Sequence, residues 1–328
     1  MTKTLQRLLT ALAVLSLALF IAACGDDDES SGGSGGSETT EEASGQIESN
    51  PDNSSVSLTI GSKNFTEQIV LGQIYAQALE AAGYDVSTDL NLGSEQIALK
   101  SLKSGDIDGY PEYTSTALTS FFDVDAGDVP SDAEEAADQV QQEFEDDNIV
   151  AFAPTPFVSA NAVGLTAEKA EELDVETISD LEGKAQDLTL FGSPECRQRV
   201  DCLVGLQEDY GLEFENFKPV DIGLRYEVLD KGQADLSILF TTDAQLAGDE
   251  YVILEDDQEV FPAGNVLFLT REEVVERAGE DYRQTIELVQ EGLTEEVMQE
   301  LSARVDLDKK DPADVAMEYL VETGYISG

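Results

Sequence analysis

Histidine and tryptophan are absent from the 328 residues, and cysteine occurs only three times. Without histidine, Ser-His-Asp and Cys-His catalysis are excluded, as are histidine-ligated zinc and iron sites. Basic residues are also scarce, since 18 Lys and Arg stand against 69 Asp and Glu, a formal charge of −51. We expect no nucleic-acid partner, because phosphate binding requires a basic surface. No Walker-type loop or dinucleotide fingerprint occurs, and we expect no metal and no cofactor.

Residues 1–23 have the pattern of a signal peptide. Lys3 and Arg7 form a short basic region, and residues 8–22 are almost wholly apolar. This run is shorter than the ~20 residues that a membrane span needs, but it suits a cleavable signal. Small residues then precede Cys24, in a pattern that resembles the lipobox of bacterial lipoproteins, so we expect a lipid on Cys24. The alternative is an ordinary signal peptide in which this cysteine is incidental.

Residues 24–55 are predicted to be the lipidated Cys24 followed by a flexible linker. It is rich in Gly, Ser and acidic residues and has almost no large apolar side chain. Such a segment cannot bury enough surface to offset its ordering entropy. The remaining residues, about 270, are enough for one large or two medium domains with their own cores.

The folded part opens with the pattern of a strand, a short loop and a helix. Residues 56–60 alternate in the manner of a strand, and apolar residues between 71 and 82 recur on one helical face. Asn64 and Glu67 have the spacing of a capping box at the start of this helix. Further strands alternate with helices along the chain, so we expect a mainly parallel sheet.

A similar order of elements recurs later in the chain. Gly105 and Asp108 stand between a predicted helix and a predicted strand, and so do Gly232 and Asp235. Two α/β lobes of one design are therefore expected, with a ligand at the carboxyl ends of their strands. The C-terminal third carries predicted helices at 272–279, 282–291, 294–305 and 312–324.

Four segments resemble the substrate-binding proteins of osmoprotectant importers of the ABC type. They are residues 61–68 (GSKNFTEQ), 109–116 (GYPEYTST), 193–199 with 202–206 (SPECRQR and CLVGL) and 240–243 (FTTD). The resemblance implies an α/β, two-lobed periplasmic-binding-protein (Venus-flytrap, type II-like) fold with two hinge crossings. It places residues 56–158 and 264–328 in a first lobe and residues 159–263 in a second.

The function that this resemblance implies is the extracytoplasmic solute-binding component of an ABC importer, and not an enzyme. The ligand would be a quaternary-ammonium or related zwitterionic compatible solute, taken up as an osmoprotectant. The implied partners are the permease and ATPase subunits, with a monomeric protein held at the outer face of the cytoplasmic membrane through Cys24. The alternatives are a receptor for another small zwitterion, such as an amino acid, and a clamshell sensory module.

The resemblance also implies which residues hold the ligand carboxylate. Lys63, Thr116 and Arg199 correspond to the residues with this role in the family. Lys63 follows a strand and precedes a helix, where an ammonium group and free backbone N–H groups together suit a carboxylate. Arg199 can bind a carboxylate with two parallel hydrogen bonds.

A quaternary ammonium group is usually bound by aromatic faces. Tyr113 and Phe240 match two positions of the family's aromatic box, whereas Asn161 and Gly264 stand where tyrosines are usual. This depletion predicts weak binding of glycine betaine.

Cys196 and Cys202 have five residues between them, in a chain predicted to be exported. A disulfide across the segment that carries Arg199 is the favoured interpretation. Free buried thiols and a metal pair are the alternatives.

Overall fold

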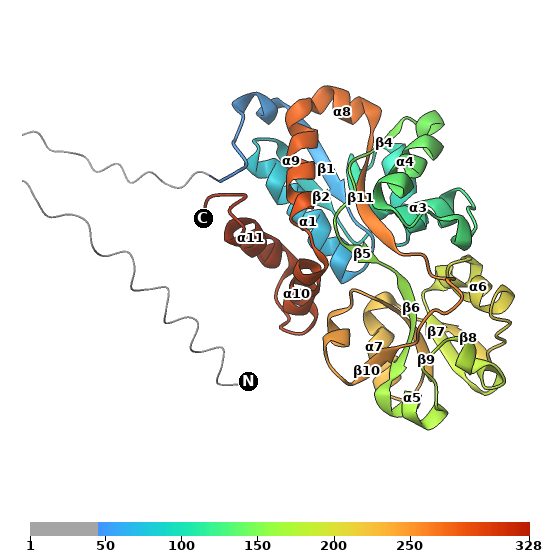
Figure 1. Ribbon diagram of the computed structural model, residues 1–328. Coiled ribbons are helices and arrows are strands. Elements are labelled where there is room, and N and C mark those ends of the chain that lie inside the picture. The colour runs from blue at the N-terminus through green and yellow to red at the C-terminus, as the bar shows by residue number, and fades with distance from the viewer. Residues whose placement is uncertain (1–44) are drawn as a thin grey trace, which may run out of the picture. The chain divides into compact units, whose positions relative to one another are not determined.

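The computed structural model describes residues 45–328, which form two α/β lobes, each built on its own sheet (Figure 1). We call the part of the chain built on the first sheet the first lobe and the part built on the second sheet the second lobe. The predicted signal peptide and Cys24 lie outside the described residues. Within residues 45–328, no helix has the length and apolar character of a membrane span.

The two sheets have the same topology. The first has the order β2 (Asp85–Asp89), β1 (Ser57–Gly61), β3 (Gly109–Tyr113), β11 (Gly264–Arg271) and β4 (Ile149–Ala151), with β5 (Val158–Ser159) paired to β11. The second has the order β8 (Asn216–Pro219), β7 (Thr189–Gly192), β9 (Leu236–Phe240), β6 (Asn161–Thr166) and β10 (Tyr251–Ile253). In each sheet three strands run parallel and the remaining main strands pair antiparallel.

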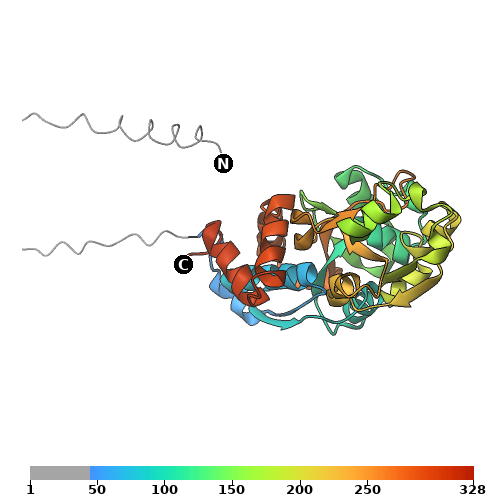
Figure 2. The same cartoon turned by 90° about the horizontal axis from the view of Figure 1, so that it is seen from below.

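The helices agree with the predicted alternation. Those of the first lobe are α1 (Thr66–Ala81), α2 (Glu95–Ser104), α3 (Thr114–Phe121), α4 (Ala133–Glu143), α8 (Glu272–Ala278), α9 (Glu280–Glu291), α10 (Glu295–Asp306) and α11 (Pro312–Glu322). Those of the second lobe are α5 (Ala167–Leu173), α6 (Leu203–Glu208) and α7 (Arg225–Asp230). Figure 2 shows α10 and α11, in red, on the first lobe at the end away from the second sheet.

The chain passes between the sheets twice, and the two passages are adjacent. It leaves the first sheet through β5 and enters β6 at Asn161, then returns from β10 to β11. At the return, Gly264 pairs with Ser159 and Asn265 pairs with Val158. Paired crossing strands of this kind are where a hinge between lobes absorbs rotation.

The predicted capping box at the start of α1 is wrong. The N-cap residue is Phe65, and no side chain caps the helix there. Glu67 instead points into the protein, where its Oε1 accepts a hydrogen bond from the Tyr113 hydroxyl. A tertiary partner has thus replaced the local one that sequence spacing indicates.

The ordered part begins before residue 56, so the predicted linker is too long at its C-terminal end. Gln46 and Ile47 donate backbone hydrogen bonds to Gly324 and Tyr325, at 3.0 and 2.8 Å. Asn53 is buried, and its amide donates to the Ala82 carbonyl at 2.9 Å. These contacts offset the ordering entropy of a segment that is polar in composition.

Asp108 and Asp235 hold equivalent strands together in the two lobes. Asp108 donates its backbone N–H to the Thr59 carbonyl, and its carboxylate accepts from the Thr59 N–H at 2.8 Å. Asp235 makes the same reciprocal pair with Thr189, with its carboxylate 2.9 Å from the backbone nitrogen. Gly105 and Gly232 precede these aspartates with φ of 82° and 61°, a conformation that glycine adopts without strain.

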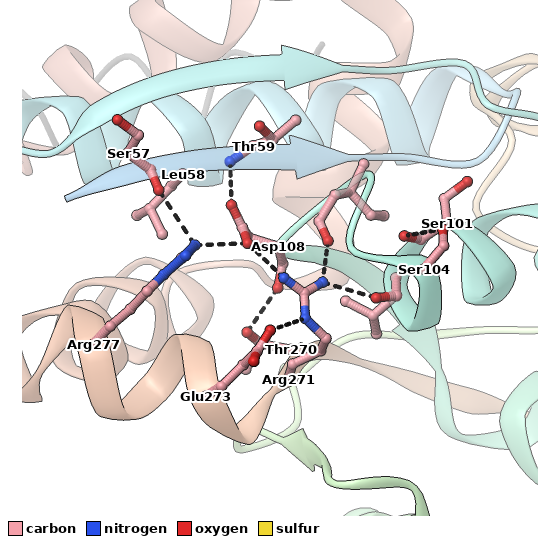
Figure 3. A network of polar contacts seen from close by, with 12 residues as sticks. Ser57, Leu58, Thr59, Ser101, Ser104, Asp108, Thr270, Arg271, Glu273 and Arg277 are labelled. Atoms are coloured by element: carbon pink, nitrogen blue, oxygen red, sulfur yellow. Dashed lines mark hydrogen bonds and ion pairs between the residues drawn. The ribbon is translucent and has the colours of Figure 1, made fainter.

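The cations beside the two aspartates differ. In the first lobe Arg271 and Arg277 both reach Asp108 Oδ1, at 2.8 and 2.7 Å (Figure 3). In the second lobe only Lys169 approaches Asp235 Oδ1, at 3.3 Å, and both side chains are partly exposed. Buried ion pairs are costly to break from one side, whereas exposed pairs contribute little.

We therefore expect Asp108→Asn to lower the free energy of unfolding by about 2–4 kcal/mol, because it removes the shared carboxylate and leaves the largely buried Arg271 with only the exposed Glu273 as an anionic partner. The asparagine oxygen can still accept from the Thr59 N–H, so the decrease in the free energy of unfolding measures the effect of removing the negative charge. The matched variant Asp235→Asn should cost no more than about 1 kcal/mol. Urea unfolding of both variants measures the difference, and equal losses would contradict the unequal role of the two pairs.

Candidate functional site

A cavity of about 80 Å³ lies between the lobes, and its lining follows the carboxyl ends of parallel strands. Lys63 comes after β1, and Thr116 lies in the first turn of α3, directly after β3. Arg199 lies in the loop after β7, and Phe240 ends β9. The folding of each lobe thus brings loops from both sheets to one place, as is typical of open α/β sheets.

The cavity gathers most of the residues predicted for the ligand site. Lining residues from that prediction are Lys63, Tyr113, Thr116, Asn161, Arg199 and Phe240, together with Cys196 and Cys202. Gly264 does not line the cavity. It lies at the hinge crossing, where an added Cβ would come within 2.3 Å of the Ser115 hydroxyl oxygen. Glycine is needed there for close approach of the backbone.

Lys63 is buried and already has an anionic partner. Its ammonium group forms an ion pair with Glu112, which is fully buried. Glu112 also accepts hydrogen bonds from the Tyr110 hydroxyl at 3.0 Å and from the Tyr113 N–H at 2.9 Å. The Lys63 ammonium lies 4.4 Å from the centre of the Tyr113 ring, within cation–π range.

Arg199 connects the two lobes. Its guanidinium binds the Asp201 carboxylate through Nε at 2.7 Å and through Nη2. Nη2 also lies 3.4 Å from the Thr116 hydroxyl, and Nη1 lies 3.8 Å from Glu95, both in the first lobe. Burial would lower the pKa of Arg199, but the carboxylates of Asp201 and Glu95 raise that pKa above its usual value. The guanidinium therefore stays charged at the cavity.

A disulfide joins Cys196 to Cys202 and encloses the segment that carries Arg199. Both cysteines are buried, and their Cα atoms are 5.2 Å apart. Arg197 in the same segment points elsewhere, since its Nη2 donates to the Phe217 carbonyl at 3.0 Å. The short closed loop limits the positions from which Arg199 can enter the cavity.

The aromatic surface of the cavity includes one residue that the sequence prediction missed. The Phe65 ring lies 5.0 Å from that of Phe240 and stacks on that of Tyr113, at 6.3 Å. Phe65 belongs to the segment 61–68, so its place in that motif was the available signal. Asn161 supplies no ring, and its amide donates to the Asp201 carbonyl at 3.0 Å, which fixes the loop beside Arg199.

Arg225 is a second lining residue that the prediction missed. Its guanidinium carbon lies 4.0 Å from the centre of the Phe240 ring, and its Nη2 donates to Asp243 at 2.9 Å. No helical or strand periodicity relates an arginine at the start of α7 to the end of β9. The contact arises only when the second sheet is assembled.

Glu67 is a buried carboxyl group next to this aromatic surface. Burial raises its pKa above the ordinary 4.5, and the hydrogen bond from Tyr113 lowers it by less. Its Oε2 has no hydrogen-bond partner among the described residues. The folded protein therefore binds the Glu67 proton more tightly than the unfolded chain does.

Because the native pKa of Glu67 is raised, native stability falls as pH rises from about 4.5 through that raised value. Glu67→Gln removes the titration but keeps an oxygen for the Tyr113 hydroxyl. We expect this variant to be more stable than wild type at pH 8, by about 1–3 kcal/mol, with a smaller gain at pH 5. Glu80→Gln, an exposed position on the same helix, serves as the control. Melting temperatures of the variants and wild type at both pH values measure this gain in stability. A gain for Glu67→Gln that is larger at pH 5 than at pH 8 would refute the argument.

Comparison with known proteins gives a consistent set of relatives. The family model described as the substrate-binding domain of ABC-type glycine betaine transport systems matches residues 56–322. The glycine-betaine-binding protein of Pseudomonas aeruginosa is 34% identical over 277 residues, covering 81% of this chain and 88% of that protein. The ergothioneine transport permease/ergothioneine binding protein EgtU of Helicobacter pylori is 27% identical over 81% of this chain, which spans only 48% of that protein.

The fold has a match among solved structures. A crystal structure of a glycine betaine/carnitine/choline ABC transporter protein is 26% identical and superposes with a TM-score of 0.64. The match covers 82% of this chain and 99% of that one. It confirms the predicted α/β two-lobed binding-protein fold.

Proposed function

Because this chain belongs to the family of substrate-binding domains of ABC-type glycine betaine transport systems, we propose that its cavity holds one small zwitterion between the lobes. The chain is the solute-binding component of an ABC importer for osmoprotectants and is not an enzyme. Such a component works outside the cytoplasmic membrane and delivers its ligand to permease and ATPase subunits. The lipid anchor and the monomeric state predicted for it belong to the proposal.

The observation that carries the proposed binding mode is the position of Arg199, which reaches the first lobe from the second. Its Nη1 is 3.8 Å from Glu95, too far for a hydrogen bond, so it can donate to a ligand carboxylate. Thr116 offers a hydroxyl at the same place, 3.4 Å from Nη2. Lys63 adds positive potential, although Glu112 neutralises much of its charge.

Closure of the lobes follows from this binding mode. A carboxylate held by Arg199 from the second lobe and by Thr116 from the first favours the conformation in which both reach it. The hinge would lie at the paired crossings between β5 and β11. We propose residues 56–158 and 264–328 as one moving lobe and residues 159–263 as the other.

Substitution of Arg199 tests the proposed carboxylate site. We expect Arg199→Ala to weaken binding of glycine betaine and carnitine about 30-fold or more, because a charge-assisted contact to the ligand is lost. Arg197→Ala removes a guanidinium from the same disulfide-enclosed loop without touching the cavity, and it should leave affinity unchanged. Isothermal titration calorimetry measures both. Equal affinity of the Arg199 variant and wild type would rule out this binding mode.

We also propose that the chain is anchored through a lipid on Cys24, with the acidic Gly/Ser-rich segment after it as its tether. The support is the sequence pattern around that cysteine and the composition of that segment. Cys24→Ser should move the protein from the membrane fraction to the medium, as immunoblots of fractionated cells would reveal. Continued retention of the variant on the membrane would exclude the anchor.

A further inference from the structure

Arg225 is fixed in the wall of the cavity by contacts that use only part of its guanidinium. It is 6% exposed and stands at the start of α7. Its Nε donates to the Ile222 carbonyl at 2.8 Å, and its Nη2 donates to Asp243 Oδ1 at 2.9 Å. Its Nη1 is buried and has no hydrogen-bond partner within residues 45–328.

Asp243 does not satisfy the unpartnered nitrogen. The Oδ1 of that carboxylate accepts from Arg225, while its Oδ2 accepts from the Tyr226 hydroxyl and the Phe240 N–H, both at 2.9 Å. Asp243 is therefore held in place and holds Arg225 in turn. Buried donors are almost always hydrogen-bonded, and an unsatisfied one is costly. Because Arg225 lines the cavity, a molecule in the cavity can supply the missing acceptor.

Arg225 also changes what the aromatic surface can bind. Its guanidinium carbon lies 4.0 Å from the centre of the Phe240 ring, and Phe65 contacts the same ring with centroids 5.0 Å apart. Phe240 therefore already has a cation–π partner within the protein, which weakens its attraction for a ligand cation. A ligand with only a trimethylammonium group gains little from that ring.

We propose that Arg225 determines ligand specificity by donating a hydrogen bond from Nη1 to a neutral acceptor of the ligand, such as a hydroxyl or carbonyl oxygen near its ammonium end. This inference rests on the proposed function, in which Arg199 holds the carboxylate. The acceptor is neutral because the single carboxylate of such a zwitterion is held by Arg199, and Asp243 already balances the charge of Arg225. The preferred solutes are therefore hydroxylated or carbonyl-bearing betaines, in preference to glycine betaine.

A matched pair of ligands tests this hydrogen bond. L-Carnitine and 4-trimethylammoniobutanoate have the same carboxylate and quaternary ammonium groups, and they differ by one hydroxyl. We expect wild type to bind L-carnitine about tenfold or more tightly, the usual effect of a hydrogen bond from a charged donor. In Arg225→Met and in Arg225→Lys the ratio of the two dissociation constants should fall to about one, chiefly because carnitine binds less tightly.

The variants have complementary uses. Arg225→Lys keeps a positive charge beside Asp243, so the test can still be made if the methionine variant does not fold. Thermal unfolding shows whether each variant is folded. Arg197→Lys is the matched control, since Arg197 also covers a phenylalanine, with its guanidinium carbon 5.1 Å from the Phe217 ring centre, but lies outside the cavity. It should keep the wild-type ratio.

The outcomes separate this inference from the proposed function. A wild-type ratio near one, or a tenfold ratio that persists in a folded Arg225 variant, would overturn the role of Arg225 and leave the proposed function intact. If wild type binds none of the three ligands (glycine betaine, L-carnitine and 4-trimethylammoniobutanoate), the proposed function is overturned, and the inference with it.

Discussion

The arrangement of the cavity depends on the ion pair between Arg199 and Asp201. This pair holds a guanidinium group of the second lobe next to residues of the first lobe. The pair lies in a loop closed by a disulfide, and the amide of Asn161 holds the Asp201 backbone from β6. Three separate constraints therefore fix one guanidinium where Thr116 and Glu95 can contact it. A flexible arginine would lose rotamer entropy on closure, whereas this one has lost much of it beforehand.

The cavity shows how a chain with 69 acidic and 18 basic residues can bind a zwitterion. The cations at the cavity each have a carboxylate partner: Lys63 with Glu112, Arg199 with Asp201 and Arg225 with Asp243. Each partner offsets the charge without filling every donor of the cation. Because each cation is paired, neither a net anion nor a net cation meets an unbalanced opposite charge in the cavity. A neutral dipolar solute needs no such charge and uses the remaining donors.

Local patterns were sufficient to predict two α/β lobes, because neighbouring residues determine where strands end and helices begin. The family resemblance supplied most of the cavity residues. Contacts between distant residues were not predictable in this way. Glu67 has the spacing of a helix cap but bonds to Tyr113, 46 residues further along. Arg225 covers Phe240 because two elements of the second sheet meet, and no periodicity links them. Family resemblance placed Gly264 in the ligand site, whereas backbone packing at the hinge explains why glycine stands there.

The shared topology of the two sheets relates the walls of the cavity to each other. Tyr113 and Phe240 each stand five positions after the aspartate that joins the equivalent strands, Asp108 and Asp235. The two rings thus occupy equivalent positions in the two lobes. A zwitterion has unlike ends, so equivalent positions alone cannot decide which way round it binds. Its orientation must come from the positions at which the two lobes carry different residues, and these fix which end of the solute each lobe holds.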